Sequence, residues 1–301
     1  MIKNTSSNTL PLENIVHRTS SRPFSLHRTV LSEGENCALY LHCHPEAELF
    51  YLEQGKLDFQ VENHTYTLNV GDGIFVPPGL IHNAYNLSDG RGSCIYRAVV
   101  FSVDMLEKSL PPYCHIYFSS LYKWRMNCIY PITSENPKNM RLLSLLPTIF
   151  TFQEMEVERY ELALTGTLFL CWQELYNLCF SKLASSPDNP SHTELQASLD
   201  YIQQHFNDQL SLRDLAASSG FSEGYFCRSF KDFTGYTPFE YLNRIRIVKS
   251  CELLTRTNKK ITEIASLCGF NNISYFNRTF SKMMGITPSG YRKTFSSAPS
   301  Q

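Results

Sequence analysis

Three histidines and one glutamate between residues 42 and 82 have the types and the spacing of a metal site. His42, His44 and Glu48 lie close together in the chain, and His82 follows in a later segment. Residues two apart in a strand share a face, so His42 and His44 would point into one interior, with Glu48 and His82 arriving from neighbouring segments. Three imidazoles and one carboxylate suit iron, manganese, nickel or zinc. The chemistry that these residue types could perform is the binding of a divalent metal.

Glycines and prolines around these residues complete two motifs. The first, HxHx3Ex6G, ends at Gly55, and the second, Gx5PxGx2Hx3N, comprises Gly71, Pro77, Gly79, His82 and Asn86. Together they resemble the two motifs of the cupin superfamily, which are small barrels of antiparallel strands on the jelly-roll plan. In cupin enzymes the matching residues bind the metal, so the resemblance implies the ligands His42, His44, Glu48 and His82.

The alternative for the same four residues is a polar pocket that binds an organic effector through hydrogen bonds and needs no metal. Short runs of β-branched and aromatic residues from about Cys37 to Phe101 support the barrel under either interpretation. Leu57, Phe59 and Val61 alternate before a turn at 62–64, and alternation resumes from Tyr66, which predicts a hairpin.

Between Leu212 and Tyr291 the chain carries two copies of one pattern. Ala216, Gly220 and Phe221 match Ala265, Gly269 and Phe270, and after one extra residue the copies align at a shift of fifty. Each copy is typical of a helix-turn-helix unit, at about 211–233 and 260–283. Ser211 and Asp214 form a predicted capping box, and Gly220 supplies the turn.

A threonine and a proline follow each second helix, as a hydroxyl N-cap and a first-turn proline. They are Thr237 with Pro238 and Thr287 with Pro288. The helix from Pro238 to Thr255 would be about 27 Å long at 1.5 Å per residue. Such a helix could separate the units by roughly the 34 Å between successive major-groove faces.

The second helix of each copy has an apolar and a polar face. Phe226, Phe230 and Phe233 recur at helical spacing and should face the core, as should Phe276 and Phe280. The opposite faces carry hydroxyls, amides and basic groups that suit base edges and phosphates. The predicted DNA-binding residues are Ser222, Glu223, Gly224, Cys227, Arg228, Lys231, Asn272, Ser274, Asn277, Arg278 and Ser281.

The run from Gly269 to Tyr291, GFNNISYFNRTFSKMMGITPSGY, resembles the motif of the AraC/XylS family of bacterial transcription regulators. The resemblance covers residues 193–295 and implies two helix-turn-helix units joined by a long helix. One departure is that Gly224 and Cys227 stand where the family often has larger base-reading side chains. The first unit is therefore expected to contribute less sequence readout than the second.

The charge distribution is consistent with a DNA-binding carboxy-terminal part. Residues 191–295 hold thirteen Lys and Arg against nine Asp and Glu, a net charge of +4 in a chain whose total is −1. This modest excess predicts a few placed phosphate contacts and binding that weakens with salt.

Residues 136–183 are expected to be helical, with an apolar stripe of Val157, Tyr160, Leu164, Leu168, Cys171, Leu175 and Leu178. The stripe could dimerise with a second copy, or it could pack on the chain's own barrel. The resemblance favours a homodimer. Residues 184–192 are predicted to form a linker that breaks the helix, and residues 1–30 are predicted to form an amino-terminal arm.

Ten cysteines occur without a CxxC pair, and the sequence shows neither an apolar signal region nor a membrane span. These features predict a cytoplasmic protein with reduced thiols that does not contact the membrane. The 301 residues allow two or three domains.

The expected architecture is a two-domain α+β protein. An antiparallel, cupin-like or jelly-roll-like β-barrel at 31–135 is followed by helices, and an all-α domain at 193–295 carries the two helix-turn-helix units. The expected function is sequence-specific transcription regulation of an operator in double-stranded DNA. Activation through RNA polymerase, in response to a small molecule, is implied by the resemblance.

A carbohydrate in the barrel is the preferred effector, because regulators of this family often carry similar histidines in a sugar-binding barrel. No cofactor is required under that interpretation, and a divalent metal is the alternative. The rival function is a metal-dependent cupin enzyme or metal sensor fused to a DNA-binding domain, but the sequence shows no separate sign of turnover, so the chain is not expected to be an enzyme.

Overall fold

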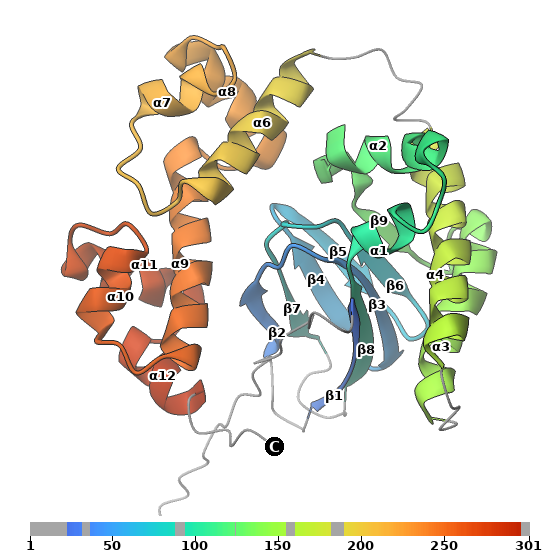
Figure 1. Ribbon diagram of the computed structural model, residues 1–301. Coiled ribbons are helices and arrows are strands. Elements are labelled where there is room, and N and C mark those ends of the chain that lie inside the picture. The colour runs from blue at the N-terminus through green and yellow to red at the C-terminus, as the bar shows by residue number, and fades with distance from the viewer. Residues whose placement is uncertain are drawn as a thin grey trace, which may run out of the picture. The chain divides into compact units, whose positions relative to one another are not determined.

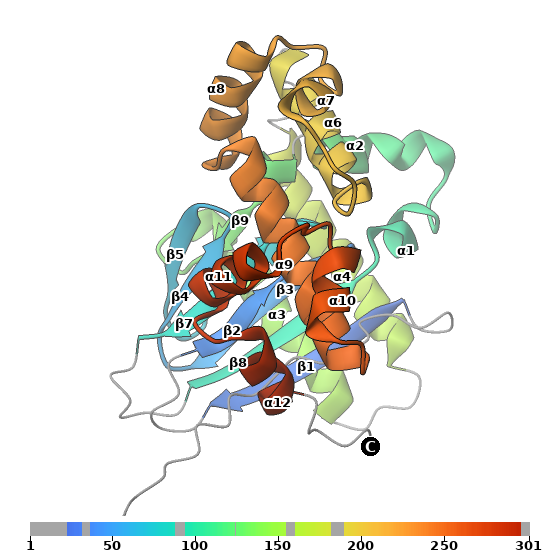
Figure 2. The ribbon, with the colours of Figure 1, turned by 90° about the vertical axis from the view of Figure 1, so that its left-hand side faces the viewer.

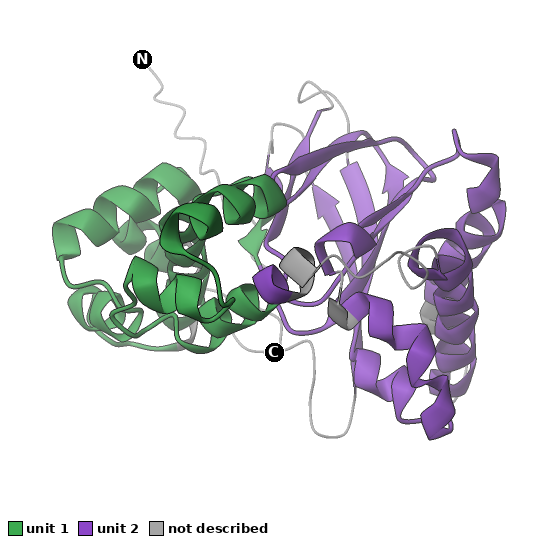
Figure 3. Cartoon of the chain, turned by 90° about the horizontal axis from the view of Figure 1, so that it is seen from above, with its two compact units in different colours: residues 1–14, 39–42, 197–301 green, residues 15–38, 43–196 purple. Residues whose placement is uncertain are grey.

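The structure is a computed structural model that describes residues 23–31, 37–87, 94–123, 125–154, 160–181 and 190–295. The described residues divide into two compact units, coloured separately in Figure 3. One contains most of the β-barrel with its helices, and the other contains the helices of the carboxy-terminal part together with Leu39–His42. Strand β2 (Cys37–His42) belongs to the barrel by its hydrogen bonds, since its neighbour in the sheet is β7 (His82–Asn86).

The barrel consists of two sheets (Figure 1). The five-stranded sheet has the order β1-β8-β3-β6-β9, with β1 at Phe24–Leu31, β8 at Cys94–Phe101, β3 at Ala47–Gln54, β6 at Gly73–Val76 and β9 at Tyr130–Ile132. The four-stranded sheet has the order β2-β7-β4-β5, with β4 at Leu57–Val61 and β5 at His64–Leu68. Pairs β1–β8, β3–β8, β3–β6, β6–β9, β4–β5 and β4–β7 are antiparallel. The expected antiparallel barrel is confirmed.

The predicted hairpin is present, and its turn has an unusual residue. Val61 pairs with His64 across a two-residue turn, and Leu57, Phe59 and Val61 are fully buried, as the alternation indicates. Glu62 holds this turn with a left-handed φ of 53°. Its buried carboxylate accepts a hydrogen bond of 2.7 Å from the Ile81 backbone nitrogen, which anchors the hairpin beside β7.

Short helices and two long ones flank the barrel. The short elements are α1 (Val103–Glu107), a 3₁₀ turn at Pro112–His115, α2 (Ile116–Lys123), and 3₁₀ turns at Arg125–Cys128 and Pro137–Asn139. The long helices are α3 (Met140–Glu154) and α4 (Glu161–Leu175), and α4 continues as a π-helical turn at Tyr176–Phe180. Helices α3 and α4 pack on the five-stranded sheet, in one core with Leu49, Phe75 and Val99.

The apolar stripe expected in this region faces the chain's own core. Leu164, Leu168, Cys171 and Leu175 are buried in the same cluster as Phe75, and Tyr160 and Leu178 pack against it. Val157 lies outside the described residues. The interpretation that the stripe packs on the chain's own barrel is therefore the right one, and dimerisation through that stripe is wrong because its side chains are already buried.

Two expected boundaries need correction. The arm was expected to reach residue 30, but β1 begins at Phe24 and pairs with β8 along its length, so Phe24–Val30 belong to the barrel. The linker was expected to reach residue 192, but α6 (Pro190–Gln204) starts at Pro190, because proline suits the first turn of a helix. Residues 1–22 and 182–189 lie outside the described residues.

The carboxy-terminal unit contains two helix-turn-helix pairs on one long helix (Figure 2). Helices α7 (Leu212–Ala217) and α8 (Glu223–Thr234) form the first pair, and α10 (Ile261–Leu267) and α11 (Ile273–Met284) form the second. Helix α9 (Pro238–Arg256) joins them, and α12 (Pro288–Phe295) follows. The nineteen residues of α9 span about 28 Å.

Local signals explain where these helices begin and end. Ser211 and Asp214 form the expected capping box, and Thr237 caps α9 with Pro238 in its first turn. Gly220 and Gly269 hold the two turns with φ of 69° and 81°, which residues with a Cβ adopt at a cost. Gly235 and Gly285, both left-handed, end α8 and α11.

The two pairs repeat the same aromatic packing. Phe226 and Phe230 in α8 are fully buried, and the Phe230 ring meets Tyr241 edge-on at 5.7 Å. In the second pair Phe276 and Phe280 are fully buried, and Phe280 meets Tyr291 edge-on at 5.5 Å. Phe233 is only half-buried. The repeat in sequence is thus a repeat in structure.

Candidate ligand site and candidate DNA-binding face

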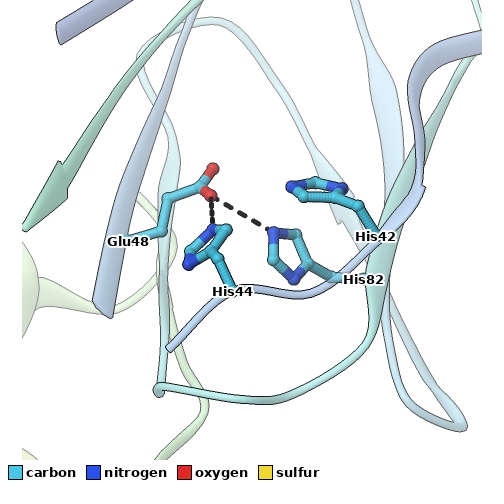
Figure 4. A group of neighbouring side chains, drawn as sticks. All are labelled: His42, His44, Glu48 and His82. Carbon is cyan, nitrogen blue, oxygen red and sulfur yellow. Dashed lines mark hydrogen bonds and ion pairs between the residues drawn. The ribbon is translucent and has the colours of Figure 1, made fainter. Parts of the chain in front are cut away.

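The four residues of the predicted metal site lie together in the barrel (Figure 4). His42 ends β2, His44 follows it, Glu48 lies in β3 and His82 begins β7. One ligand atom from each residue lies within 4.8 Å of those of the other three. His44, Glu48 and His82 are 7%, 3% and 1% exposed, so the group they form is almost closed to solvent. We call these four residues the histidine cluster.

Backbone carbonyls fix the orientation of all three imidazoles. The Nδ1 atoms of His42, His44 and His82 lie 2.7, 3.0 and 2.9 Å from the carbonyl oxygens of Tyr40, Glu46 and Leu80. A carbonyl oxygen only accepts hydrogen bonds, so each Nδ1 carries a proton and donates it. In the neutral ring the lone pair is then on Nε2, the atom that a metal would bind.

Glu48 faces two of these Nε2 atoms. Its Oε2 lies 3.2 Å from Nε2 of His44 and 3.2 Å from Nε2 of His82. If both rings are neutral, two nitrogen lone pairs point at a carboxylate oxygen, and that arrangement is repulsive unless positive charge lies among them. A divalent cation supplies that charge, and protons on the two Nε2 atoms also would.

Burial and hydrogen bonding act in opposite directions on the Glu48 carboxyl. Burial alone would raise its pKa, but the hydrogen bonds from His44 and His82, together with their charges, hold the pKa of Glu48 well below its usual range. When both rings carry a proton on Nε2, Glu48 is therefore an ionised carboxylate at neutral pH. An anionic oxygen among imidazole nitrogens is a donor set that fits a divalent transition metal.

Two more ionisable residues lie beside the histidine cluster, and sequence reasoning missed both. His27 in β1 is 8% exposed, and burial lowers its pKa to about 4, against the effect of Glu48, which raises it. Its Nε2 lies 2.8 Å from the Ser25 hydroxyl. Glu46 is 5% exposed, with a carboxylate oxygen 3.8 Å from Nδ1 of His44. His27 lies within the residues expected to form the amino-terminal arm, so it was not considered for the barrel. Glu46 was missed because the first motif has only one glutamate position, which Glu48 occupies.

Aromatic rings occupy the barrel interior next to the histidine cluster. The Phe59 ring stacks on His82 at 6.0 Å, and Phe50 packs against Phe59 at 4.7 Å and on Tyr96 at 4.8 Å. Phe50, Phe59 and Tyr96 are at most 2% exposed. On this side the histidine cluster is therefore bordered by buried aromatic rings, whereas His27 and Glu46 are its ionisable neighbours.

The structure places the predicted DNA-binding residues on the outer sides of α8 and α11. Nine of them are exposed, Cys227 and Ser281 are half-buried, and none is buried. The nine exposed residues are Ser222, Glu223, Gly224, Arg228, Lys231, Asn272, Ser274, Asn277 and Arg278. Their exposure agrees with the predicted face, while their contacts with DNA stay a prediction.

Two members of this face also have structural contacts. Asn272 caps α11, where its side-chain oxygen accepts a hydrogen bond of 2.9 Å from the Tyr275 backbone nitrogen. The Arg278 guanidinium lies over the Tyr275 ring, 5.8 Å from its centroid. Sequence reasoning missed Tyr275 and its counterpart Tyr225, which are both 42% exposed on the helices' outer sides.

Two helix-turn-helix pairs on one connecting helix, together with a jelly-roll-like barrel, define a two-domain DNA-binding transcription regulator. Comparison with known protein families supports this assignment in both the amino-terminal and the carboxy-terminal part of the chain. A helix-turn-helix domain family matches residues 215–294, and a cupin domain family matches residues 28–97.

Relatives extend this result to nearly the whole chain. An uncharacterized HTH-type transcriptional regulator of Bacillus subtilis (strain 168), YdeC, is 26% identical over 290 residues, which cover 92% of this chain and 94% of the relative. The HTH-type transcriptional activator RhaS of Enterobacter sp. (strain 638) is 25% identical over 258 residues, covering 84% and 87%. The chain is thus similar over nearly its whole length to helix-turn-helix transcription regulators, in agreement with its resemblance to the AraC/XylS family.

A solved structure of similar fold is ToxT from Vibrio cholerae O395, crystallised with (E)-4-(8-methylnaphthalen-1-yl)but-3-enoic acid. The TM-score is 0.56 at 18% identity, with 91% of this chain and 99% of ToxT covered. It confirms the two-domain fold. Because the relatives are transcription regulators, the expectation that the chain is not an enzyme is also confirmed.

No helix in the described part of the chain combines the length and apolar character that crossing a membrane requires.

Proposed function

We propose that the histidine cluster in the barrel of this regulator holds a divalent metal ion. We further propose that the regulator senses a small ligand in the barrel, and that this ligand changes the affinity of the regulator for an operator. The observation that carries the proposal is the hydrogen bonding of the three imidazoles. Each Nδ1 donates to a carbonyl, which leaves Nε2 as the ligand atom, and the Glu48 carboxyl group lies 3.2 Å from Nε2 of both His44 and His82. His42, His44, Glu48 and His82 would hold the ion, and iron, manganese, nickel and zinc all suit this donor set.

The bound ion would supply positive charge where four ligand atoms converge. The chain's own residues supply the rest of the site. The carbonyls of Tyr40, Glu46 and Leu80 hold the rings in position, and the Phe59 ring stacks on His82. Such hydrogen bonds from metal-binding histidines to backbone carbonyls fix the ring orientation and favour binding.

A carbohydrate is the organic effector that we propose for the same barrel. Imidazoles and a carboxylate bind hydroxyl groups, and the rings of Phe50, Phe59 and Tyr96 offer stacking surfaces for the apolar face of a sugar. These rings are buried and in contact with one another. We give the metal priority because ligand atoms of all four residues already lie within 4.8 Å of one another.

Three further proposals concern how the regulator acts. Activation through RNA polymerase is supported by the relative RhaS, which is named a transcriptional activator. Homodimerisation would need a surface other than the buried stripe. We propose the outer side of α4, where Leu162 is 84% and Leu170 40% exposed.

Action in the cytoplasm is supported by the absence of disulfides among the described residues, which include all ten cysteines.

The test of the sensing function begins with an operator. A DNA site is selected from a random duplex pool with the full chain, and its affinity is measured by fluorescence anisotropy. The affinity is then measured with zinc, manganese, nickel or ferrous iron after chelation, and with a panel of sugars. The proposal predicts that at least one metal or sugar changes the affinity and that His44→Ala removes the change. If no metal or sugar changes it, the sensing proposal is wrong.

A further inference from the structure

Tyr275 lies between two side chains that come from different parts of the carboxy-terminal unit. On α11 itself, Arg278 follows three residues later and therefore lies on the same side of the helix. Its guanidinium carbon is 5.8 Å from the centroid of the Tyr275 ring, a cation–π contact. From α9, the Asn243 side-chain nitrogen donates a hydrogen bond of 2.8 Å to the Tyr275 hydroxyl.

The Tyr275 ring is held at several points. Its backbone nitrogen donates to the Asn272 side chain at 2.9 Å, its ring lies 6.1 Å from that of Phe270, and its hydroxyl is fixed by Asn243. Yet the residue is 42% exposed, on the same side of the helix as the predicted base-reading residues. A ring that is both exposed and fixed can support a neighbouring side chain.

Arg278 is the residue that gains from this support. An exposed arginine has several rotatable bonds, and fixing them to make a contact with a base costs free energy. A ring below the guanidinium restricts the side chain before DNA arrives, so less of that cost remains on binding. Bidentate contact with a guanine requires a defined guanidinium plane, which makes this restriction matter for selectivity.

The first helix-turn-helix unit offers an internal comparison. Its counterparts are Tyr225 and Arg228, and there the Tyr225 ring packs 4.8 Å from Phe221, closer than the corresponding 6.1 Å in the second unit. Arg228 is exposed like Arg278. The tyrosine of the first unit thus lies closer to the phenylalanine of its own turn than the tyrosine of the second unit does.

We propose that Tyr275 is a positioning residue, which presents Arg278 to a base pair, and that Asn243 on the connecting helix holds Tyr275 in place. The inference rests on the proposed role of α11 in reading the operator. It makes the second unit the main source of sequence selectivity, and it makes the readout depend on a residue of α9 that lies outside both helix-turn-helix pairs.

The experiment compares base preferences rather than affinity alone. The full chain and its variants each select DNA from a random duplex pool, and the preference at every position of the site is measured by sequencing. Arg278→Ala identifies the base pair that Arg278 reads. Tyr275→Leu, which removes ring and hydroxyl, is expected to reduce preference at that same base pair by about two- to thirtyfold, the range that a cation–π contact supports.

Two milder variants separate the hydroxyl from the ring. Tyr275→Phe and Asn243→Ala each remove the same hydrogen bond and keep the aromatic ring, so they are expected to cause equal and smaller losses, and the double variant no larger loss than either one. The double variant Tyr275→Leu with Arg278→Ala should match Arg278→Ala alone at that base pair. Tyr225→Leu in the first unit is the control and should leave that preference unchanged.

Several outcomes overturn the proposal. If Tyr275→Leu weakens binding to all sequences evenly, or adds its full effect to that of Arg278→Ala, then Tyr275 has only a structural role. If Arg278→Ala changes no base preference while DNA is still bound, the assigned reading role of α11 fails, and the positioning role fails with it. Unchanged helicity in circular dichroism is required of each variant, and Tyr275→Phe with Asn243→Ala carries the test should Tyr275→Leu not fold.

Discussion

Nε2 of His82 lies 3.2 Å from Oε2 of Glu48, although 34 positions separate the two residues in the chain. Glu48 lies in β3 of one sheet and His82 begins β7 of the other, so this contact joins the two sheets of the barrel. The carbonyl of Leu80 fixes the His82 ring from the opposite side. A buried carboxylate and an imidazole nitrogen are thus held against one another, and a proton or a metal cation between them would stabilise the pair.

The histidine cluster should control the response to ligand without controlling DNA binding itself. His44→Ala or His82→Ala removes a ligand atom from the barrel, whereas the predicted DNA face belongs to the other compact unit. The expected result is loss of the effector response in a reporter assay, with operator affinity largely intact. His64→Ala, at an exposed histidine of β5, serves as the control. A normal response in both cluster variants would refute the assignment.

Arg278→Ala should weaken binding to the selected operator by about 1–3 kcal/mol, the contribution of one bidentate base contact. The measurement is an electrophoretic mobility-shift series at fixed salt, since salt itself changes affinity. Arg213→Ala, which removes an exposed arginine from α7, matches the change in charge outside the recognition helices. Equal losses in the two variants would mean that Arg278 contributes only general electrostatic attraction.

Equivalent glycines of the two turns should tolerate alanine differently. Both Gly220 and Gly269 have left-handed φ, which costs a residue with a Cβ about 1–2 kcal/mol. A Cβ at Gly220 meets no atom within 4 Å, whereas one at Gly269 would lie 2.9 Å from the carbonyl oxygens of Phe206 and Asn207. Gly269→Ala should therefore destabilise the unit by about 1–3 kcal/mol more than Gly220→Ala.

Thermal or urea unfolding of the two glycine variants gives this difference directly. It would also test the packing of the loop after α6 on the second turn, where Arg246 donates hydrogen bonds of 2.7 and 2.8 Å to the carbonyls of Phe206 and Asp208. Equal destabilisation by the two substitutions would show that this loop does not pack against Gly269 as described.

The lowered pKa of His27 predicts that the stability of the barrel depends on pH. Burial lowers its pKa from 6.5 to about 4, so the folded state disfavours the protonated ring. The stability that the neutral ring provides is complete above pH 6.5 and is lost as the pH falls towards 4, up to about 3 kcal/mol. The carboxylate of Glu48, with a lowered pKa, loses its contribution only at pH values below about 4.5.

Chemical unfolding of the metal-free protein between pH 7 and pH 4 measures this effect. His27→Gln cannot be protonated in that range and should flatten the slope between pH 6.5 and 4, while His64→Gln should leave it unchanged. A slope that is the same in His27→Gln and in the wild-type protein would show that another group is responsible.

Spacing in the sequence predicted the parts of the structure that depend on local rules. The repeat at a shift of fifty, the capping box at Ser211 and the left-handed glycines follow from the helix-turn-helix geometry itself, and all are present. The four residues of the histidine cluster were also found, because a strand places His42 and His44 together and the second motif supplies His82.

Features that depend on tertiary packing could not be predicted in the same way. An apolar stripe shows that a helix buries one side but not what covers it, so Leu164 and Leu168 fitted a dimer and the chain's own core equally well. His27 enters the barrel because β1 pairs with β8, a contact across some seventy residues that no local pattern encodes. The bond between Asn243 and Tyr275 likewise joins two helices and has no spacing rule.

The most direct test of the account is the metal content of the untagged protein by plasma mass spectrometry, measured for wild type, His44→Ala and His82→Ala, with His64→Ala as the control. If the histidine cluster binds a metal, the wild type and His64→Ala hold about one divalent transition metal per chain, and both cluster variants lose most of it. Wild-type protein that binds no iron, manganese, nickel or zinc, even after incubation with each ion and removal of the excess, would contradict the account.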